Sequence, residues 1–298
     1  MSRLILPAGA ALLASLAAPA LGQQPGLIRA APAAEGPPSE KAPARREARI
    51  EEAARSFWEA VKLEATRYAR DSAALLTAPL RWDARDRQTA GSFVLLLGGL
   101  ILADEEIDRL ARRTRSDWTD RVSAATTSLG GGDGPKVSAG LLLGGLLLRD
   151  REMREMGRDA LEAGVLARTL QRYVLKPAFG RERPEDSDGD TAFRPFSGDD
   201  SFPSAHATQV FCVASVIAMR ARGWILPTLA YAAATVVAFD RVNDRAHFAS
   251  DVFAGAVFGT AVGRFLVSRH RAEEKPGAPE ASLRIIPIRG GLAARLEF

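Results

Sequence analysis

Residues 176–184 read KPAFGRERP, residues 203–206 read PSAH, and residues 241–251 read RVNDRAHFASD. These blocks place cations, imidazoles and a carboxylate at short fixed spacings: Lys176, Arg183, His206, Arg241, His247 and Asp251. Arginine suits an oxyanion such as phosphate because its planar guanidinium donates two parallel hydrogen bonds. The blocks hold two of the chain's three histidines. They therefore predict an oxyanion site at which a histidine acts.

The second and third blocks supply groups for nucleophilic and acid–base chemistry. Ser204 and the amide of Ala205 open an apolar stretch that we expect to be helical, and a helix N-terminus offers N–H groups to an anion. His247 and Asp251 are four residues apart, so on a helix they would share one face. A carboxylate on one ring nitrogen leaves the other free to attack. His206 would then protonate the leaving oxygen as general acid.

Each block alone also has a structural interpretation. His247 with Asp251 is typical of an exposed pair on a helix surface, and basic loops such as the one from Lys176 to Arg183 are common. The ordered occurrence of all three blocks between residues 176 and 251 favours the functional interpretation.

Two further residues are interpreted as having no role in chemistry. His270 lies between Arg269 and Arg271, and we expect it to be solvated. Cys212, the single cysteine, lies in an apolar run and is predicted to be an inert core residue.

The three blocks resemble the type 2 phosphatidic acid phosphatase (PAP2) and vanadium haloperoxidase superfamily. The pattern of that superfamily is Lys-x6-Arg-Pro, then Pro-Ser-Gly-His, then Ser-Arg-x5-His-x3-Asp. The order, the residue types and the internal spacings agree over residues 176–251. The resemblance implies an all-α helical bundle of the PAP2/haloperoxidase type, to which the sequence adds a short C-terminal β-hairpin.

The resemblance also implies a role for each residue. Those that bind phosphate would be Lys176, Arg183, Ser204, Ala205 and Arg241. The catalytic residues would be His247 as the nucleophile that forms a phosphohistidine, Asp251 as its orienting partner, and His206 as the general acid. No metal or other cofactor is implied for the phosphatases of the superfamily, whereas the haloperoxidases bind vanadate in the same pocket.

The chain departs from the family pattern at two positions. Ala205 stands where the family usually has Gly, which keeps a backbone amide for the anion unless the position needs a positive φ. Asp240 stands where the family usually has Ser, and its carboxylate would either repel substrate or pair with Arg241 or Arg245.

The loop between the first two blocks, residues 185–202, is acidic. We expect it to be a solvated surface loop, with a rim that selects substrates or binds a cation as the alternative.

Composition divides the chain into four parts. Residues 1–22 resemble a signal peptide, because Arg3 precedes an apolar, alanine-rich run that ends in small residues. Residues 23–44 are a Pro/Ala-rich linker, residues 45–270 the helical phosphatase domain, and residues 271–298 a linker and short hairpin.

Helical periodicity predicts most of the domain. The expected helical segments are Ala48–Leu76, Phe93–Ala103, Asp104–Leu129, Ala139–Leu148, Asp150–Leu175, Gln209–Met219, Trp224–Phe239 and Val252–Val267. The apolar runs cover roughly 10 to 16 residues, fewer than the ~20 needed to span a bilayer. The mean hydropathy is −0.06. These features favour the buried helices of a soluble bundle, with an integral membrane protein as the alternative.

The sequence thus predicts an exported protein, periplasmic or secreted, or else a membrane protein with an extracytoplasmic active site. The predicted activity is that of an acid phosphatase-type hydrolase that cleaves phosphomonoesters or pyrophosphates, with a phosphorylated small molecule or a lipid phosphate as substrate and membrane-surface association in the second case. Nucleic-acid binding is not expected, since the net charge of +4 is spread along the chain. The alternatives are a vanadium-dependent haloperoxidase and a non-catalytic phosphate-binding envelope protein.

Overall fold

The structure, a computed structural model, describes residues 41–128, 134–187, 192–274, 282–288 and 291–297. The predicted signal peptide, residues 1–22, and residues 23–40 of the predicted linker lie outside the described residues. The chain divides into two compact units, residues 1–61 and residues 62–298. All of the predicted site residues lie in the second unit.

The described part of the chain is predominantly helical, so the predicted all-α class is confirmed. Its helices are α2 (Lys41–Thr77), α3 (Ala84–Thr114), α4 (Asp117–Ser128), α5 (Gly134–Leu148), α6 (Arg151–Leu170), α7 (Lys176–Phe179), α8 (Ala205–Arg220), α9 (Ile225–Asn243) and α10 (Ala249–Glu273). A 3-10 turn, Ala78–Arg81, follows α2, and a π turn, Gln171–Leu175, joins α6 to α7. Strands β1 (Ser282–Ile288) and β2 (Gly291–Glu297) pair with each other in antiparallel register. Neither the bundle nor the site depends on these two strands.

Helix α3 joins two segments that the sequence analysis separated. Its start is fixed by a capping box, in which Asp83 and Asp86 each accept the other's backbone N–H. The helix then runs through the apolar stretch into the acidic one and ends at Thr114, with a second helix, α4, beginning at Asp117. The expected single region from Asp104 to Leu129 is therefore two helices.

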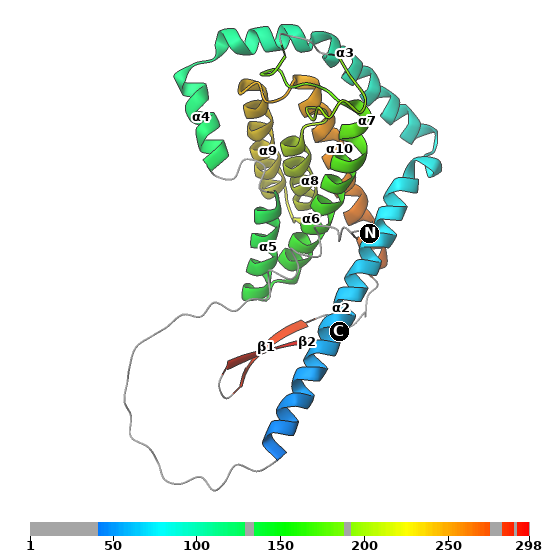
Figure 1. Ribbon diagram of the computed structural model, residues 1–298, viewed down its shortest axis with the longest axis vertical. Coiled ribbons are helices and arrows are strands. Elements are labelled where there is room, and N and C mark those ends of the chain that lie inside the picture. Colours follow the sequence, from blue (N-terminus) through cyan, green and yellow to red (C-terminus); the bar gives the residue numbers. More distant parts are fainter. Residues whose placement is uncertain (1–40, 129–133, 188–191, 275–281, 289–290, 298) are drawn as a thin grey trace, which may run out of the picture. The chain divides into compact units, whose positions relative to one another are not determined.

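Helix α8 lies at the centre of the bundle, where it packs against α6, α9 and α10 (Figure 1). Its buried face contributes Cys212, Val213 and Val216 to the main core cluster, together with apolar residues of α6 and α10. Burial raises the pKa of the Cys212 thiol to about 12. The interpretation of Cys212 as an inert core residue is confirmed.

A stripe of glycines brings α10 against the backbone of α8. A Cβ at Gly255 would lie 2.5 Å from the carbonyl oxygen of Ser204, and a Cβ at Gly259 would lie 2.1 Å from that of Thr208. Only glycine permits this approach, because such distances lie well inside van der Waals contact. The stripe places the first turn of α8, which carries His206, beside the first turn of α10, which carries Asp251.

Two helices of the described residues, α9 and α10, are long and apolar enough to cross a membrane. In the most apolar window of α9 only 11% of the residues are buried, against 50% for α10. A buried core helix passes the same test of length and hydropathy, so α10 is weak evidence for a membrane span. The apolar surface of α9, by contrast, has little protein against it, and Leu229 and Phe239 are both exposed.

His270 is buried, contrary to the expectation that it is solvated. Its Nδ1 lies 2.7 Å from a carboxylate oxygen of Asp159, and its Nε2 lies 3.1 Å from one of Asp71. Asp71 and Glu162 stand close enough to His270 to hold a metal ion. However, Arg67 Nε lies 3.4 Å from Glu162 Oε2, so a guanidinium already supplies positive charge to this group. The sequence suggested an exposed His270 because arginines 269 and 271 flank it. In the structure Arg269 also turns inward and pairs with Asp71.

Candidate active site

The three sequence blocks meet at one end of the bundle. Backbone hydrogen bonds join the blocks or the residues just beside them: the Ser201 amide donates to the Arg181 carbonyl at 2.9 Å, that of Ser204 to Asp251 at 2.9 Å, and that of Glu185 to Arg245 at 3.1 Å. The predicted convergence of the blocks is therefore present in the fold.

Arg181, which the sequence analysis did not select, is a buried anchor of this region. Its side chain is fully buried and donates to Asp251 Oδ1 at 2.6 Å and to Asp104 Oδ2 at 2.7 Å. It also donates to the hydroxyl of Ser250 at 2.8 Å. Both carboxylates are fully buried as well, so one guanidinium compensates two buried charges.

Aromatic rings enclose this arginine. The guanidinium carbon of Arg181 lies 4.1 Å from the ring centroid of Phe248 and 4.8 Å from that of Phe193. Phe193 packs on Phe202 with a centroid distance of 5.2 Å, and Phe202 packs on Phe179 at 4.7 Å. These edge-on contacts connect the loop after α7 to the segment before α8.

His247 and Asp251 lie together, but not across one turn of a helix as expected. Helix α10 begins at Ala249 with Phe248 as its N-cap, so His247 precedes the helix. Asp251 acts as a capping residue, and its Oδ2 accepts the Phe248 amide at 2.9 Å. The capping role of Asp251 could not be predicted from the four-residue spacing, because two residues on one face of a helix have the same spacing.

A serine hydroxyl stands between these two groups. The distance from His247 Nδ1 to Asp251 Oδ2 is 3.8 Å, too long for a hydrogen bond. Ser201 Oγ donates to Asp251 Oδ2 at 2.6 Å and lies 3.3 Å from His247 Nδ1. Burial lowers the pKa of His247, which favours its neutral form.

His206 lies in the first turn of α8 and faces several cations. Burial, together with the nearby charges of Arg241, His247, Arg168 and Arg183, lowers its pKa to about 4. His206 is therefore close enough to Arg241 and Arg183, two of the predicted phosphate ligands, for their charges to affect its pKa. Arg168, an exposed residue of α6, was not selected from the sequence.

Lys176 and Arg183, the two predicted phosphate ligands of the first block, share one partner. Lys176 Nζ lies 3.2 Å from Asp200 Oδ2, and Arg183 Nη2 lies 3.1 Å from Asp200 Oδ1. Asp200 belongs to the acidic loop that we expected to be solvated, and its side chain is half exposed while it pairs with these two cations.

The third predicted phosphate ligand, Arg241, is also held by an acid. Asp240 Oδ2 accepts two hydrogen bonds from its guanidinium, the one from Nε measuring 3.1 Å. Asp240 is buried and Asp244 lies 3.5 Å from the same guanidinium. Arg245 pairs instead with Asp108 at 2.9 Å. Of the two partners considered for Asp240, the structure therefore has Arg241.

Ser204 and Ala205 form the N-terminal end of α8. Ser204 is the N-cap, fully buried, and its hydroxyl accepts from the Ala207 amide. Ala205 is the first helical residue, a position whose amide has no partner within a helix. Its backbone is helical, so the Gly of the family pattern is not needed here for a positive φ. Phosphate binding by these two residues stays a prediction.

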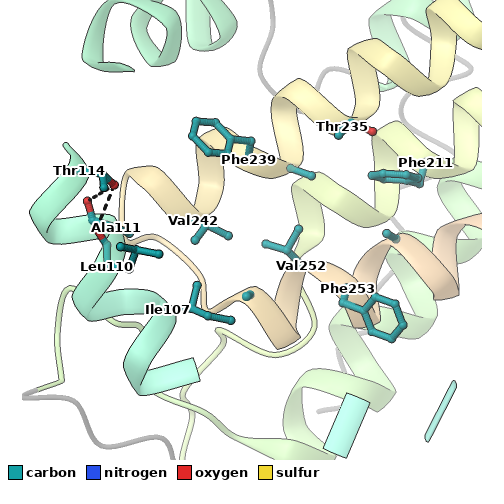
Figure 2. Close-up of a pocket in the computed structure, with 13 residues that line it drawn as sticks. Ile107, Leu110, Ala111, Thr114, Phe211, Thr235, Phe239, Val242, Val252 and Phe253 are labelled. Carbon is teal, nitrogen blue, oxygen red and sulfur yellow. Dashed lines mark hydrogen bonds between the residues drawn. The ribbon is translucent and has the colours of Figure 1, made fainter. Parts of the chain in front are cut away.

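An apolar groove of about 470 Å³ adjoins these blocks (Figure 2). Its wall includes Val242 and Val252, the residues that directly follow Arg241 and Asp251. Helix α3 closes another side with Ile107, Leu110 and Ala111, and apart from two threonines the lining is apolar. Side chains of α3, α8, α9 and α10 thus line one apolar groove.

Residues 161–275 match the family model described as PAP2 superfamily. This region, less than half of the chain, resembles the PAP2 superfamily. It contains every predicted site residue, and the resemblance predicted from the three blocks is confirmed.

Two solved structures resemble this chain. The crystal structure of Aquifex aeolicus LpxE aligns with a TM-score of 0.43 and 22% identity, over 55% of this chain and 93% of that chain. The crystal structure of the first transmembrane PAP2 type phosphatidylglycerolphosphate phosphatase from Bacillus subtilis aligns with a TM-score of 0.45 and 21% identity, over 62% and 96%. No curated protein matches the chain.

Proposed function

We propose that this PAP2 chain is a phosphatase that hydrolyses phosphomonoesters or pyrophosphates, with His247 as nucleophile and no metal. The observation that carries the proposal is the convergence of His206 and His247 with three cationic side chains at the joined ends of α8 and α10. Two histidines suit a two-step transfer, because one attacks while the other transfers the proton to the leaving oxygen.

The first step transfers the phosphoryl group to His247. Lys176, Arg183 and Arg241 hold its oxygens and offset their charge. The Nδ1–H of His247 points to Ser201 Oγ, which leaves the Nε2 lone pair to attack phosphorus. As the P–N bond forms, the bond from phosphorus to the leaving oxygen breaks, and His206 gives its proton to that oxygen.

The second step restores the enzyme. Neutral His206 removes a proton from a water molecule, whose oxygen attacks the phosphorus of the phosphohistidine. The P–N bond breaks with its electron pair returning to Nε2 of His247. Inorganic phosphate then leaves, and His206 is protonated again for the next cycle.

The substrate class is a lipid phosphate. The apolar groove is lined by side chains that suit an acyl chain, and two of them, Val242 and Val252, directly follow Arg241 and Asp251 in the sequence. The exposed apolar face of α9 gives the protein a surface for lipid contact. The enzyme is exported and acts at the outer side of a membrane.

The first experiment measures phosphate release from p-nitrophenyl phosphate and from phosphatidic acid in detergent micelles, in EDTA, beside His247→Ala. The expected result is activity that survives chelation and is lost in the variant. Vanadate-dependent halide oxidation without phosphate release would favour the haloperoxidase alternative. Retained phosphate binding without either reaction would favour the non-catalytic envelope protein.

A second variant separates lipid from small substrates. Ala111→Phe fills the groove from α3, away from the charged residues. It should lower kcat/KM for phosphatidic acid by about tenfold while leaving p-nitrophenyl phosphate unchanged. Equal effects on both substrates would contradict a role for the groove in binding lipid.

A further inference from the structure

Asp200 occupies the space between two cations that the proposed function assigns to phosphate. One carboxylate oxygen, Oδ2, lies 3.2 Å from Lys176 Nζ. The other, Oδ1, lies 3.3 Å from Arg183 Nε and 3.1 Å from Arg183 Nη2. Lys176 also donates to the backbone carbonyl of Asp200. Two oxygens of one anion are thus held by one cation each, which is the arrangement that a phosphoryl group requires.

The burial of the three side chains places the carboxylate on the solvent side of the cations. The side chain of Lys176 is 13% exposed and that of Arg183 is 35% exposed, whereas that of Asp200 is 51% exposed. An anion that enters from solvent must therefore displace the carboxylate before it can contact the two cations. A half-exposed ion pair contributes little stability, so a stronger anion can displace it.

The carboxylate stays ionised at neutral and mildly acidic pH. Burial alone would raise the pKa of Asp200, but the charges of Lys176 and Arg183 hold it below the usual value. Protonation therefore does not remove the carboxylate from the cations. Only a competing anion does so.

We propose that Asp200 is an internal competitor, a carboxylate that a phosphoryl group must displace from Lys176 and Arg183. This inference rests on the proposed function. The cost of displacing the carboxylate is the same for any anion that takes its place. Asp200 thereby lowers the affinity of this pair of cations for phosphomonoesters and phosphodiesters alike.

Other acids near the site lack this double contact. Glu185 approaches Arg183 alone, with a separation of 3.7 Å. Asp199, the preceding residue, makes no ion pair among the described residues, and its amide donates to Ser197 Oγ. Asp199→Asn therefore removes the same charge from the same loop without touching the cations, and it is the matched control for Asp200→Asn.

The test uses the full chain and measures binding of inorganic phosphate and of dimethyl phosphate by calorimetry at neutral pH. Asp200→Asn should bind inorganic phosphate about tenfold more tightly than wild type. It should gain about as much for dimethyl phosphate, because either anion displaces the same carboxylate. Asp199→Asn should stay within about twofold of wild type, as expected for a charge that pairs with neither cation. Asp200→Ser, measured in parallel, checks that the effect comes from the lost carboxylate and not from the new amide.

Hydrolysis of p-nitrophenyl phosphate separates this inference from the proposed function. If the wild type binds and hydrolyses phosphate compounds but Asp200→Asn binds phosphate equally or more weakly, the inference on Asp200 is overturned and the phosphatase stands. If neither wild type nor any variant binds phosphate or hydrolyses the ester, both are overturned. Binding that appears only after Asp200 is replaced supports the displacement.

Discussion

Ser201 donates its hydroxyl to Asp251 at 2.6 Å, and through this contact the carboxylate reaches His247. Since Ser201 Oγ lies 3.3 Å from His247 Nδ1 and the carboxylate lies at 3.8 Å, the serine is the group that fixes the imidazole. Asp251 in turn is held by Arg181 and by the Phe248 amide. The nucleophile is thus positioned by a chain of buried groups from the first and third sequence blocks and by Ser201, which lies just before the second.

Ser201→Ala should lower kcat by about 10- to 100-fold with little change in KM, because the imidazole loses its fixed tautomer and orientation. Steady-state kinetics with p-nitrophenyl phosphate measure the two constants separately. Ser197→Ala, an exposed serine of the same loop, is the control and should leave both unchanged. A rise in KM at constant kcat would mean that Ser201 binds substrate and does not position His247.

Arg181→Met should destabilise the fold by about 3–5 kcal/mol, because Asp104 and Asp251 would be left buried without their common cation. Chemical unfolding monitored by tryptophan fluorescence measures the change. Arg194→Met provides the comparison, since Arg194 pairs with Glu182 at 3.3 Å on the surface. That variant should change stability by less than about 1 kcal/mol. A similar small loss for both arginines would contradict the anchoring role of Arg181.

The sequence was sufficient for the fold class, the family and the meeting of the three blocks, because motif spacing and helical periodicity are local properties. It was not sufficient for Arg181, Ser201 or Asp200. Their roles depend on how the segment between α7 and α8 folds, and no periodic pattern marks such contacts. Arg181 had one available signal, its place two residues before Arg183 in a phenylalanine-flanked segment.

The apolar helices show a different limit. Runs such as Phe93–Ala103 were expected to be buried because they are almost uncharged. In the structure Leu95 is 79% exposed and Leu102 is 89% exposed. Composition identifies an apolar helix, but it does not say whether protein or lipid covers it.

The pH dependence should favour acid conditions. The pKa of His206 is lowered to about 4, so in the free enzyme the protonated, acid-competent form declines as pH rises above that value. The pKa of His247 is lowered as well, so the nucleophile stays neutral below its usual titration range. Hence kcat/KM should rise as pH falls from about 7.5 to about 5. The decline of kcat should occur at higher pH, because a bound phosphoryl group raises the pKa of His206.

Arg168→Gln tests the electrostatic origin of this profile. Removing one of the cations that lower the pKa of His206 should shift the decline of kcat/KM toward higher pH. Arg172→Gln, an exposed arginine one turn further along, should leave the profile in place. A kcat/KM that increases with pH over the whole range would contradict His206 as the acid.

Asp240→Ser restores the residue usual in the family and should tighten inhibition by inorganic phosphate about three- to tenfold. Asp240 holds the guanidinium of Arg241 and has one buried oxygen without a hydrogen-bond partner, so its removal frees positive charge at little structural cost. The inhibition constant against p-nitrophenyl phosphate measures the effect, with Asp186→Asn as an exposed charge control. Because Asp200 and Asp240 engage different cations, the double variant with Asp200→Asn should show near-additive gains in binding free energy. Weaker inhibition in Asp240→Ser would mean that Asp240 orients Arg241 toward phosphate and does not compete with it.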